Sequence, residues 1–440
     1  MSSAGASQLV TRLRASRGVR AGMVVALATV VMNGAGYLYN VACIRYLGSR
    51  VYGDVAAVLA LIALVSLPLG SLQLILAREI AQIPESRGVG HLLRRWTVRA
   101  GFGGAVLIAL GLALISPLQD ALSIHSRGTL AFGILGIGFA VVAAVFFGVL
   151  QGAQRFTALG VTYGAGGMSR PVLVTPALLV GFGAVGALAV NLLAGLLSII
   201  IAGWALRDLW PSRVETTALP RHDTRQMVTM LVGSLAFASL TNFDILLANY
   251  FFDDAQAGVY AAAALVGKAV LFLPAAVVTV LLPKAAERVA AGRTSRNILL
   301  ASASVTVVLT LAATGVLALI PESLLVWAFG GEFREATGLL VWFGLAMTVA
   351  AVVNVYLSVY FAERDAKFPL LVLGGAIAQV VAISLWHAEP RSIVIATLAC
   401  CSSVLLLHEL LFPHSLIRAW RGRGGGAPAL SQEVQPPGPF

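Results

Sequence analysis

The chain alternates between long apolar stretches and short polar ones over nearly its whole length. Each apolar stretch is roughly twenty residues long, the length that an α-helix needs to span the hydrocarbon core of a bilayer. The stretches are continuous, so they do not fit the alternating strands of a membrane barrel. The pattern predicts an all-α polytopic membrane protein with about twelve membrane-crossing helices. We expect them at residues 22–43, 51–77, 98–116, 129–150, 157–181, 184–206, 227–250, 256–282, 298–320, 337–361, 368–386 and 392–412.

The composition agrees with this prediction. Hydrophobic residues make up 59% of the chain and charged residues only 11%, whereas about a quarter of the residues of a soluble domain are charged. The net charge of +11 would suggest nucleic acid as the partner of a soluble protein. In a membrane protein the same charge holds loops in the cytoplasm against anionic lipid. We therefore expect membrane lipids and no nucleic acid as partners.

The positions of the basic residues predict the orientation in the membrane. With the N-terminus in the cytoplasm, 23 of the 30 lysines and arginines fall on the cytoplasmic side of the twelve helices. Five fall on the outer side and two inside helices. Because cytoplasmic loops are enriched in lysine and arginine, this bias predicts that both termini are cytoplasmic.

Two matches along the chain indicate an internal repeat. Tyr52 and Tyr260 occupy similar contexts at an offset of 208 residues, and Phe156 and Phe368 at an offset of 212. A unit of six helices is even, so both copies run in the same direction, as parallel repeats that form two lobes around a central cavity. The expected segments are a basic cytoplasmic tail at 1–21, an N-terminal lobe at 22–206, a cytoplasmic linker at 207–226, a C-terminal lobe at 227–412 and a disordered cytoplasmic tail at 413–440.

Enzyme, metal and cofactor signals are weak. Cys43, Cys400 and Cys401 lie in apolar segments without the spacing of a metal site or a disulfide framework. We expect no metal, no cofactor and no catalytic residue. The remaining enzyme hypothesis is a membrane glycosyltransferase or glycan polymerase, which typically needs a sizeable outer loop. The only outer acidic pair, Asp253 and Asp254, falls in a short loop.

Five short runs of sequence carry a family resemblance. They are Arg45–Gly53, Asp244–Tyr250, Ala257–Tyr260, Leu281–Lys284 and Phe329–Phe333. They resemble the polysaccharide-transporter branch of the multidrug/oligosaccharidyl-lipid/polysaccharide exporter superfamily. The resemblance extends over about residues 20–412, and its patterns are loose and are not a catalytic signature.

Members of that branch are flippases of polysaccharide biosynthesis. The resemblance therefore implies a transporter of the bacterial inner membrane. It would move a polyprenyl-diphosphate-linked oligosaccharide from the cytoplasmic to the outer leaflet by alternating access. A glycan polymerase or glycosyltransferases are the expected protein partners. The alternative is a multidrug/cation antiporter of the same fold, although no residue of the drug-antiporter cation site matches this chain.

Three ionisable residues fall inside predicted helices, where such residues face a partner or a hydrated cavity. Arg170 and Lys268 lie about 17–18 Å from the outer ends of their helices, and Asp244 about 9 Å. The first hypothesis is that Arg170 and Lys268 face the cavity between the lobes and attract the diphosphate, since arginine binds phosphate bidentately. The second is an internal salt bridge between Asp244 and Lys268, with Arg170 bonded to backbone carbonyls. Asp244 is alternatively a proton or sodium site.

Polar amides inside the predicted helices complete the candidate substrate-binding set. They are Asn33, Asn40 and Asn242. The amides either line a hydrated path for sugars or bridge neighbouring helices, which is the commoner role.

Overall fold

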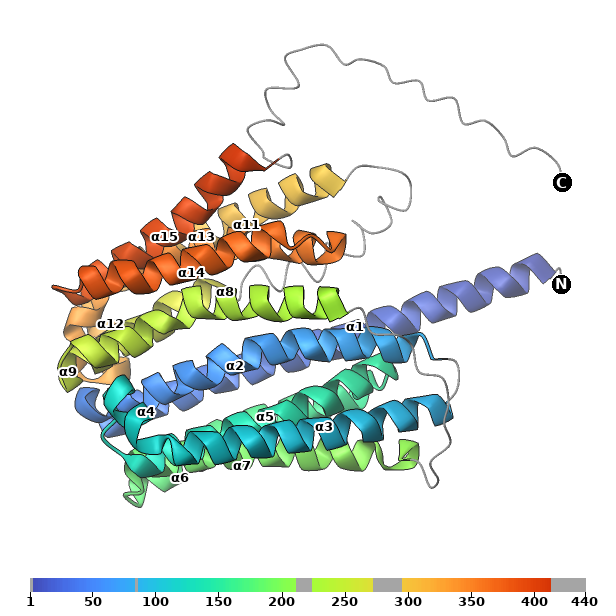
Figure 1. Cartoon of the computed structure of the whole chain (residues 1–440), viewed down its shortest axis with the longest axis horizontal. Coiled ribbons are helices and arrows are strands. Elements are labelled where there is room, and N and C mark those ends of the chain that lie inside the picture. Colours follow the sequence, from blue (N-terminus) through green and yellow to red (C-terminus); the bar gives the residue numbers. More distant parts are fainter. Residues whose placement is uncertain (1–2, 84–85, 211–223, 272–294, 413–440) are drawn as a thin grey trace, which may run out of the picture.

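The protein is helical throughout the part that the structure describes (Figure 1). The computed structural model describes residues 3–83, 86–210, 224–271 and 295–412. The α-helices are α1 (Ser3–Leu47), α2 (Ser49–Ala81), α3 (Ser86–Ala113), α4 (Ile115–Leu122), α5 (Arg127–Gly152), α6 (Phe156–Leu179), α7 (Gly183–Ala205), α8 (Thr224–Phe251), α9 (Asp254–Gly267), α11 (Ser295–Ala318), α12 (Glu322–Phe329), α13 (Thr337–Glu363), α14 (Lys367–Leu385) and α15 (Pro390–Leu411). Three short 3-10 segments accompany them, η1 (Arg207–Leu209), η2 (Lys268–Leu271) and η3 (Gly331–Ala336).

The predicted helices agree with this structure. Each of the twelve predicted ranges coincides with a long helix, or with α9 and η2 in the case of residues 256–282, of which 272–282 lie outside the described residues. Ten of the described helices are long and apolar enough to cross a membrane. The other two predicted crossings are α6, which packs between α1 and α7, and α9. The all-α polytopic prediction is therefore confirmed.

Three boundaries differ from the prediction or cannot be compared with it. Residues 3–21 belong to α1 rather than to a separate tail, because no proline in this stretch interrupts the helix. The linker predicted at 207–226 contains η1 and the start of α8, and its residues 211–223 lie outside the described residues. The tail predicted at 413–440 also lies outside them.

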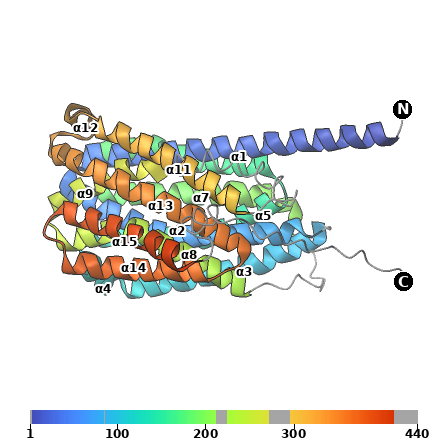
Figure 2. The same cartoon turned by 90° about the horizontal axis from the view of Figure 1, so that it is seen from above.

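The order of the helices repeats along the chain, as the sequence predicted. We call α1–α7 the first half and α8–α15 the second half. In the first half a helix of eight residues, α4, precedes the last three long helices, and α12, also of eight residues, has the same place in the second half. Figure 2 shows these two short helices on opposite sides of the molecule at the same end.

The two ends of the molecule differ in how the halves meet. We call the end where α1 begins and α15 ends the terminal end, and the opposite end the closed end (Figure 1). One hydrophobic core joins both halves toward the closed end and includes Tyr52, Leu130, Tyr260 and Phe343. Toward the terminal end each half has its own core. These contain Leu92 and Val149 in the first half, and Tyr356, Tyr360, Phe368 and Val372 in the second.

A seam between α2 and α8 extends through much of the depth of the molecule. Toward its terminal side the hydroxyls of Ser71 and Ser234 are hydrogen bonded at 2.5 Å. Toward the closed end, Gly53 faces Asn249, and a Cβ atom on this glycine would lie 3.0 Å from the Asn249 side-chain oxygen. The halves are thus in contact along α2 and α8 even where their hydrophobic cores are separate.

Candidate functional site

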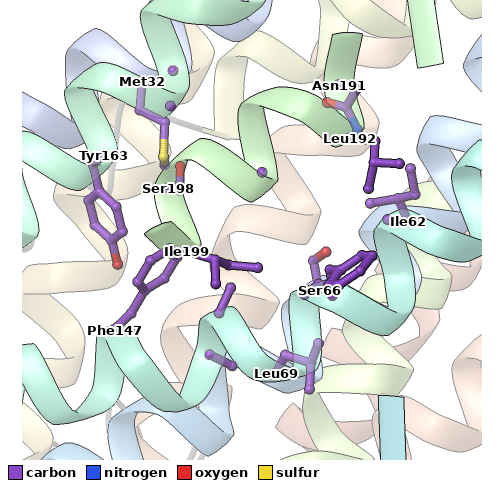
Figure 3. A pocket seen from close by; sticks show the side chains of 18 of the residues that line it. Met32, Ile62, Ser66, Leu69, Phe147, Tyr163, Asn191, Leu192, Ser198 and Ile199 are labelled. Atoms are coloured by element: carbon purple, nitrogen blue, oxygen red, sulfur yellow. The ribbon is translucent and has the colours of Figure 1, made fainter. Parts of the chain in front are cut away.

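A cavity of about 320 Å³ lies inside the first half (Figure 3). Its wall is formed by α1, α2, α5, α6 and α7. Each of these helices packs against its neighbours around the cavity, except that α1 and α2 make few contacts with each other. Both helices lie on the side of the second half, because α2 packs on α8 and α9, and α1 contacts α9 and α12. The cavity is lined by Met32, Ile62, Ser66, Leu69, Gly70, Gln73, Gly136, Phe139, Ala140, Ala143, Ala144, Phe147, Tyr163, Gly166, Gly167, Arg170, Asn191, Leu192, Gly195, Ser198 and Ile199.

Arg170 places a cation in this cavity at mid-depth. It lies 14 residues after the first residue of α6 and nine before the last, which corresponds to about 21 Å and 14 Å along the helix. Its Nε is buried without a hydrogen-bond partner among the described residues. The next residue, Pro171, has no backbone N–H, so the carbonyl of Gly167 lacks its regular helical donor. An unpaired guanidinium nitrogen and a carbonyl without its regular helical donor therefore lie on one face of α6.

The cavity wall on the terminal side carries a chain of neutral polar groups. The Gln73 side-chain amide donates hydrogen bonds of 3.0 Å to the Gln151 side-chain oxygen and to the Tyr163 hydroxyl. The Tyr163 ring packs edge-on against Phe147, with ring centroids 5.2 Å apart. Packing and hydrogen bonds thus fix the orientation of this wall before any ligand binds. Sequence reasoning missed Gln73 and Tyr163, because single neutral polar residues in apolar helices are common.

Asp244 and Lys268 lie in the second half, away from the cavity of Arg170. The Lys268 ammonium is 2.8 Å from the Asp244 carboxylate, and both side chains are largely buried. The Tyr260 hydroxyl donates a second hydrogen bond to Asp244, at 2.9 Å. This is the internal salt bridge that the second sequence hypothesis described. Arg170 differs from that hypothesis, because no backbone carbonyl accepts a bond from its Nε in the described part of the chain.

The three candidate asparagines are not brought together by the fold. Asn242 donates to the Ala238 carbonyl one turn earlier in α8, at 3.0 Å. Asn40 donates to the Gly36 carbonyl at 2.9 Å and accepts a bond of 3.1 Å from the Tyr52 hydroxyl. Asn33 is half-buried on α1. None of the three lines the cavity of Arg170.

Hydrogen bonds join the halves across the closed end. Glu332 of the second half accepts bonds from the Ser49 backbone N–H at 2.9 Å and from the Ser49 hydroxyl at 2.8 Å. These bonds hold the pKa of Glu332 below its ordinary value. In the other direction, from the second half to the first, Asn249 donates to the carbonyls of Leu122 and Ser123 at the end of α4. Each half thus binds the segment around the short helix of the other.

Two further contacts follow the same pattern. Arg45 donates to the Trp327 carbonyl in α12 at 3.3 Å. His125, three residues after the end of α4, lies with its Nε2 3.8 Å from a carboxylate oxygen of Asp254. Within the part of the chain that is described, no group of three His, Cys, Asp or Glu side chains is placed to hold a metal ion. The candidate charges of the sequence analysis are therefore an unpaired Arg170 Nε in the cavity and a closed ion pair of Asp244 with Lys268.

Comparison with known proteins identifies the family. The family model described as "Polysaccharide biosynthesis protein" matches residues 19–289, more than half of the chain. The chain belongs to this polysaccharide biosynthesis protein family. The sequence resemblance to polysaccharide transporters is thereby confirmed. A search of curated proteins finds no match.

Solved structures show the fold that this polysaccharide biosynthesis family member shares. The chain is similar to an inward-facing MATE family multidrug transporter of the MOP superfamily, at a TM-score of 0.65 and 14% identity over 91% of this chain and 100% of that one. It is also similar to the lipid II flippase MurJ in an inward closed conformation, at a TM-score of 0.66 and 12% identity over 88% and 87% of the two chains. A eukaryotic MATE transporter gives a TM-score of 0.64 at 12% identity, over 93% and 98%. The protein therefore has the membrane transporter and flippase fold of this superfamily.

Proposed function

We propose that this protein flips a polyprenyl-diphosphate-linked oligosaccharide from the cytoplasmic to the outer leaflet of the bacterial inner membrane by alternating access. The substrate is a precursor of a cell-envelope polysaccharide, consistent with the name of the family. MurJ, a protein of similar fold, is by its name a flippase of lipid II. Glycan polymerases or glycosyltransferases are the expected partners that make or use the transported lipid.

The observation that carries this proposal is the uncompensated charge of Arg170. A guanidinium at mid-depth of the membrane is costly unless an anion or a hydrated cavity compensates it. Its planar fork fits two phosphate oxygens at once. Among the described residues no aspartate or glutamate lines the same cavity, so a cationic drug would meet only a positive charge there. This arrangement favours the anionic lipid headgroup over the substrate of a multidrug/cation antiporter.

The arrangement of the hydrophobic cores supports alternating access. The halves share one core at the closed end and have separate cores at the terminal end. Parting of the shared core and approach of the separate ones would expose the interior to the other side of the membrane. Transport by this motion needs no catalytic group.

The distribution of basic residues supports a cytoplasmic terminal end. Most of the lysines and arginines in the described segments lie at this end, in agreement with the charge pattern of the sequence. In this orientation the closed end faces outward. A lipid headgroup would then enter from the cytoplasm, where lipid-linked precursors are assembled on the inner leaflet.

A liposome assay tests the proposed function. The purified protein is reconstituted with a fluorescent polyprenyl-diphospho-oligosaccharide, and a membrane-impermeant quencher reports how fast inner-leaflet probe reaches the outer leaflet. Wild type should accelerate this movement over empty liposomes. Arg170→Ala should lose most of the acceleration, whereas Arg95→Ala, which changes an exposed arginine outside the cavity, should keep it.

The outcomes separate the candidate functions. No acceleration with several different glycans would contradict the flippase, and cation-driven dye efflux by the same liposomes would then favour the antiporter. Acceleration that Arg170→Ala leaves unchanged would keep the flippase and remove Arg170 from its substrate site. Chemical change of the lipid-linked glycan during the assay would instead indicate a membrane enzyme.

A further inference from the structure

We propose that the cavity of the first half binds a sugar phosphate at two points. The site would recognise the sugar that is attached directly to the phosphate. Arg170 binds the phosphate at one end, and Gln73 and Tyr163 bind the sugar at the other. The proposed function supplies the source of this ligand, a lipid-linked glycan. The site itself is argued from the geometry of the cavity.

The first argument is the spacing of the two ends. Tyr163 and Arg170 are seven residues apart on α6, so they lie on the same face of the helix, two turns apart, at about 10.5 Å along its axis. Both line the cavity, with Gly166 and Gly167 between them. This length suits one phosphate joined to one sugar ring, and it is too long for a phosphate alone to reach both ends.

The second argument is the supply of hydrogen-bonding groups along that length. Gln73 donates both of its amide hydrogens to Gln151 and Tyr163, so its own oxygen remains an acceptor. Tyr163 accepts the bond from Gln73 and keeps its hydroxyl hydrogen to donate. The Gly167 carbonyl adds an acceptor because Pro171 cannot donate to it. Sugar hydroxyls both donate and accept, so this mixture of neutral groups matches a sugar ring.

The third argument is the apolar surface of the cavity. The rings of Phe139, Phe147 and Tyr163 line it, and the C–H faces of a sugar ring pack well on aromatic rings. The volume of about 320 Å³ lies at the small end of the usual range for ligand pockets. It suits one sugar and its phosphate rather than a whole oligosaccharide. The remaining sugars and the lipid would therefore extend out of the cavity.

The fourth argument is the path for those remaining parts. The contacts between α1 and α2 are few compared with those between the other neighbouring helices around the cavity. Both helices also contact the second half, so a substrate between the halves would pass between α1 and α2 to reach the cavity. Met32 of α1 and Ser66, Leu69 and Gly70 of α2 line the cavity on this side. A substrate in the space between the halves can thus insert its phosphate-linked sugar sideways into the first half.

Binding of soluble fragments to the purified full-length protein tests the site. The probes are inorganic phosphate, free glucose, and the 1-phosphates of glucose, galactose and N-acetylglucosamine, titrated by isothermal calorimetry in detergent. At least one sugar 1-phosphate should bind about tenfold more tightly than phosphate or free sugar. Tyr163→Phe keeps the ring and removes the hydroxyl, so it should weaken sugar 1-phosphate binding about two- to tenfold and leave phosphate binding unchanged.

Further variants complete the test. Gln73→Leu should act like Tyr163→Phe, Arg170→Gln should weaken phosphate and sugar 1-phosphate alike, and Tyr250→Phe, which changes an exposed tyrosine on α8, should change neither. The proposal is overturned if no sugar 1-phosphate binds better than phosphate, or if Tyr163→Phe weakens both ligands equally. Selective sugar phosphate binding without lipid flipping would contradict the proposed function and keep this site. Flipping without selective binding would keep the function and reject the site.

Discussion

Gly258 of α9 lies directly against Ser49 of α2, where the two halves meet at the closed end. A Cβ atom on Gly258 would lie 1.9 Å from the Ser49 carbonyl oxygen, far inside van der Waals contact. On the other side of this contact, a Cβ atom added to Gly53 of α2 would lie 3.3 Å from the Gly258 backbone nitrogen. Each of the two glycines is the fifth residue of its helix. The second helices of the two halves thus touch at glycine backbone.

We therefore expect Gly258→Ala to force the closed end apart. The added methyl group collides with backbone, which cannot move aside as a flexible side chain can. Spin labels on the exposed residues Asp120 and Glu335, one in each half, would report the separation by pulsed electron resonance. The native Cys43, Cys400 and Cys401 are first replaced by alanine. The distance distribution should shift to longer values in Gly258→Ala.

Gly315→Ala is the matched control for that experiment. Gly315 lies inside α11, and an added Cβ there would have no atom within 4 Å. Alanine is also the better helix former, so this variant should keep the wild-type distances. Equal distances in wild type and Gly258→Ala would contradict the closed-end contact as described.

The sequence predicted the long helices well because membrane spans have a strong signature. A run of about twenty apolar residues has few other interpretations. It missed α4 and α12, because helices of eight residues are shorter than a span. The segment of α4 also contains Pro117 and Asp120, which are typical of a loop. The repeat places these short helices at equivalent positions, which no apolar run indicates.

The candidate site was predictable only in part. Arg170 and the Asp244–Lys268 pair were found because charges inside apolar helices are rare. That Arg170 lines a cavity of the first half depends on how five helices pack. The same holds for Gln73 and Tyr163, which are 90 residues apart in sequence. The contact between these two residues depends on how the helices pack, so no local pattern in the sequence indicates it.

Glu332 should hold the closed end shut through its bonds to Ser49. Glu332→Ala removes the acceptor of two hydrogen bonds, and we expect the open population at this end to rise about two- to tenfold. Ser49→Ala removes one of the same bonds, so the effects of the two substitutions should not add in the double variant. The distance between labels at Asp120 and Glu335 measures the open population in the two single variants and in the double variant. Fully additive effects would show that the two residues act independently.

The contact of Glu332 should also be insensitive to pH near neutrality. The bonds to Ser49 lower the pKa of Glu332. The stabilisation that ionised Glu332 gives to the closed end is therefore fully present above the ordinary pKa of 4.5. It is lost only as the pH falls through the lower pKa of the folded protein. Titration of Glu332 should therefore not change the distance between the labels from about pH 5 to 8. A transition in that range that Glu332→Ala abolishes would contradict this assignment.

The pair of Arg155 and Asp208 at the terminal end gives a second prediction on pH. Arg155 binds one Asp208 oxygen at 2.6 Å and lowers the pKa of this carboxyl to about 2. Its stabilisation is therefore fully present above the ordinary aspartate pKa and is lost as the pH falls through about 2. Both side chains are partly exposed, so Asp208→Asn should reduce the free energy of unfolding by less than about 1 kcal/mol. Thermal unfolding in detergent should show this difference to be constant between pH 5 and 8, and a difference that grew or vanished in this range would contradict it.

The first half makes a contact similar to that of Asp244 and Tyr260 without a charged residue. Asn40 and Asp244 each lie seven residues before the end of their helix. Each accepts a bond from a tyrosine of the next helix, Tyr52 at 3.1 Å and Tyr260 at 2.9 Å. Asparagine thus suffices to join the first two helices of a half. We infer that the ion pair of the second half serves transport rather than folding.

Substitutions of the pair separate these two roles. Lys268→Met leaves a buried carboxylate without its cation and should lower the free energy of unfolding by about 3–5 kcal/mol. The double variant Asp244→Asn with Lys268→Met should regain most of that loss, because asparagine can accept the bond from Tyr260 as Asn40 does from Tyr52. Thermal unfolding in detergent measures the stability, and the liposome assay measures the rate of flipping.

Asn40→Asp, which places an uncompensated carboxylate at the equivalent position of the first half, should destabilise like Lys268→Met. A double variant as unstable as Lys268→Met would show that the fold itself needs the pair. A stable double variant that flips lipid at less than a tenth of the wild-type rate would assign the charge to transport.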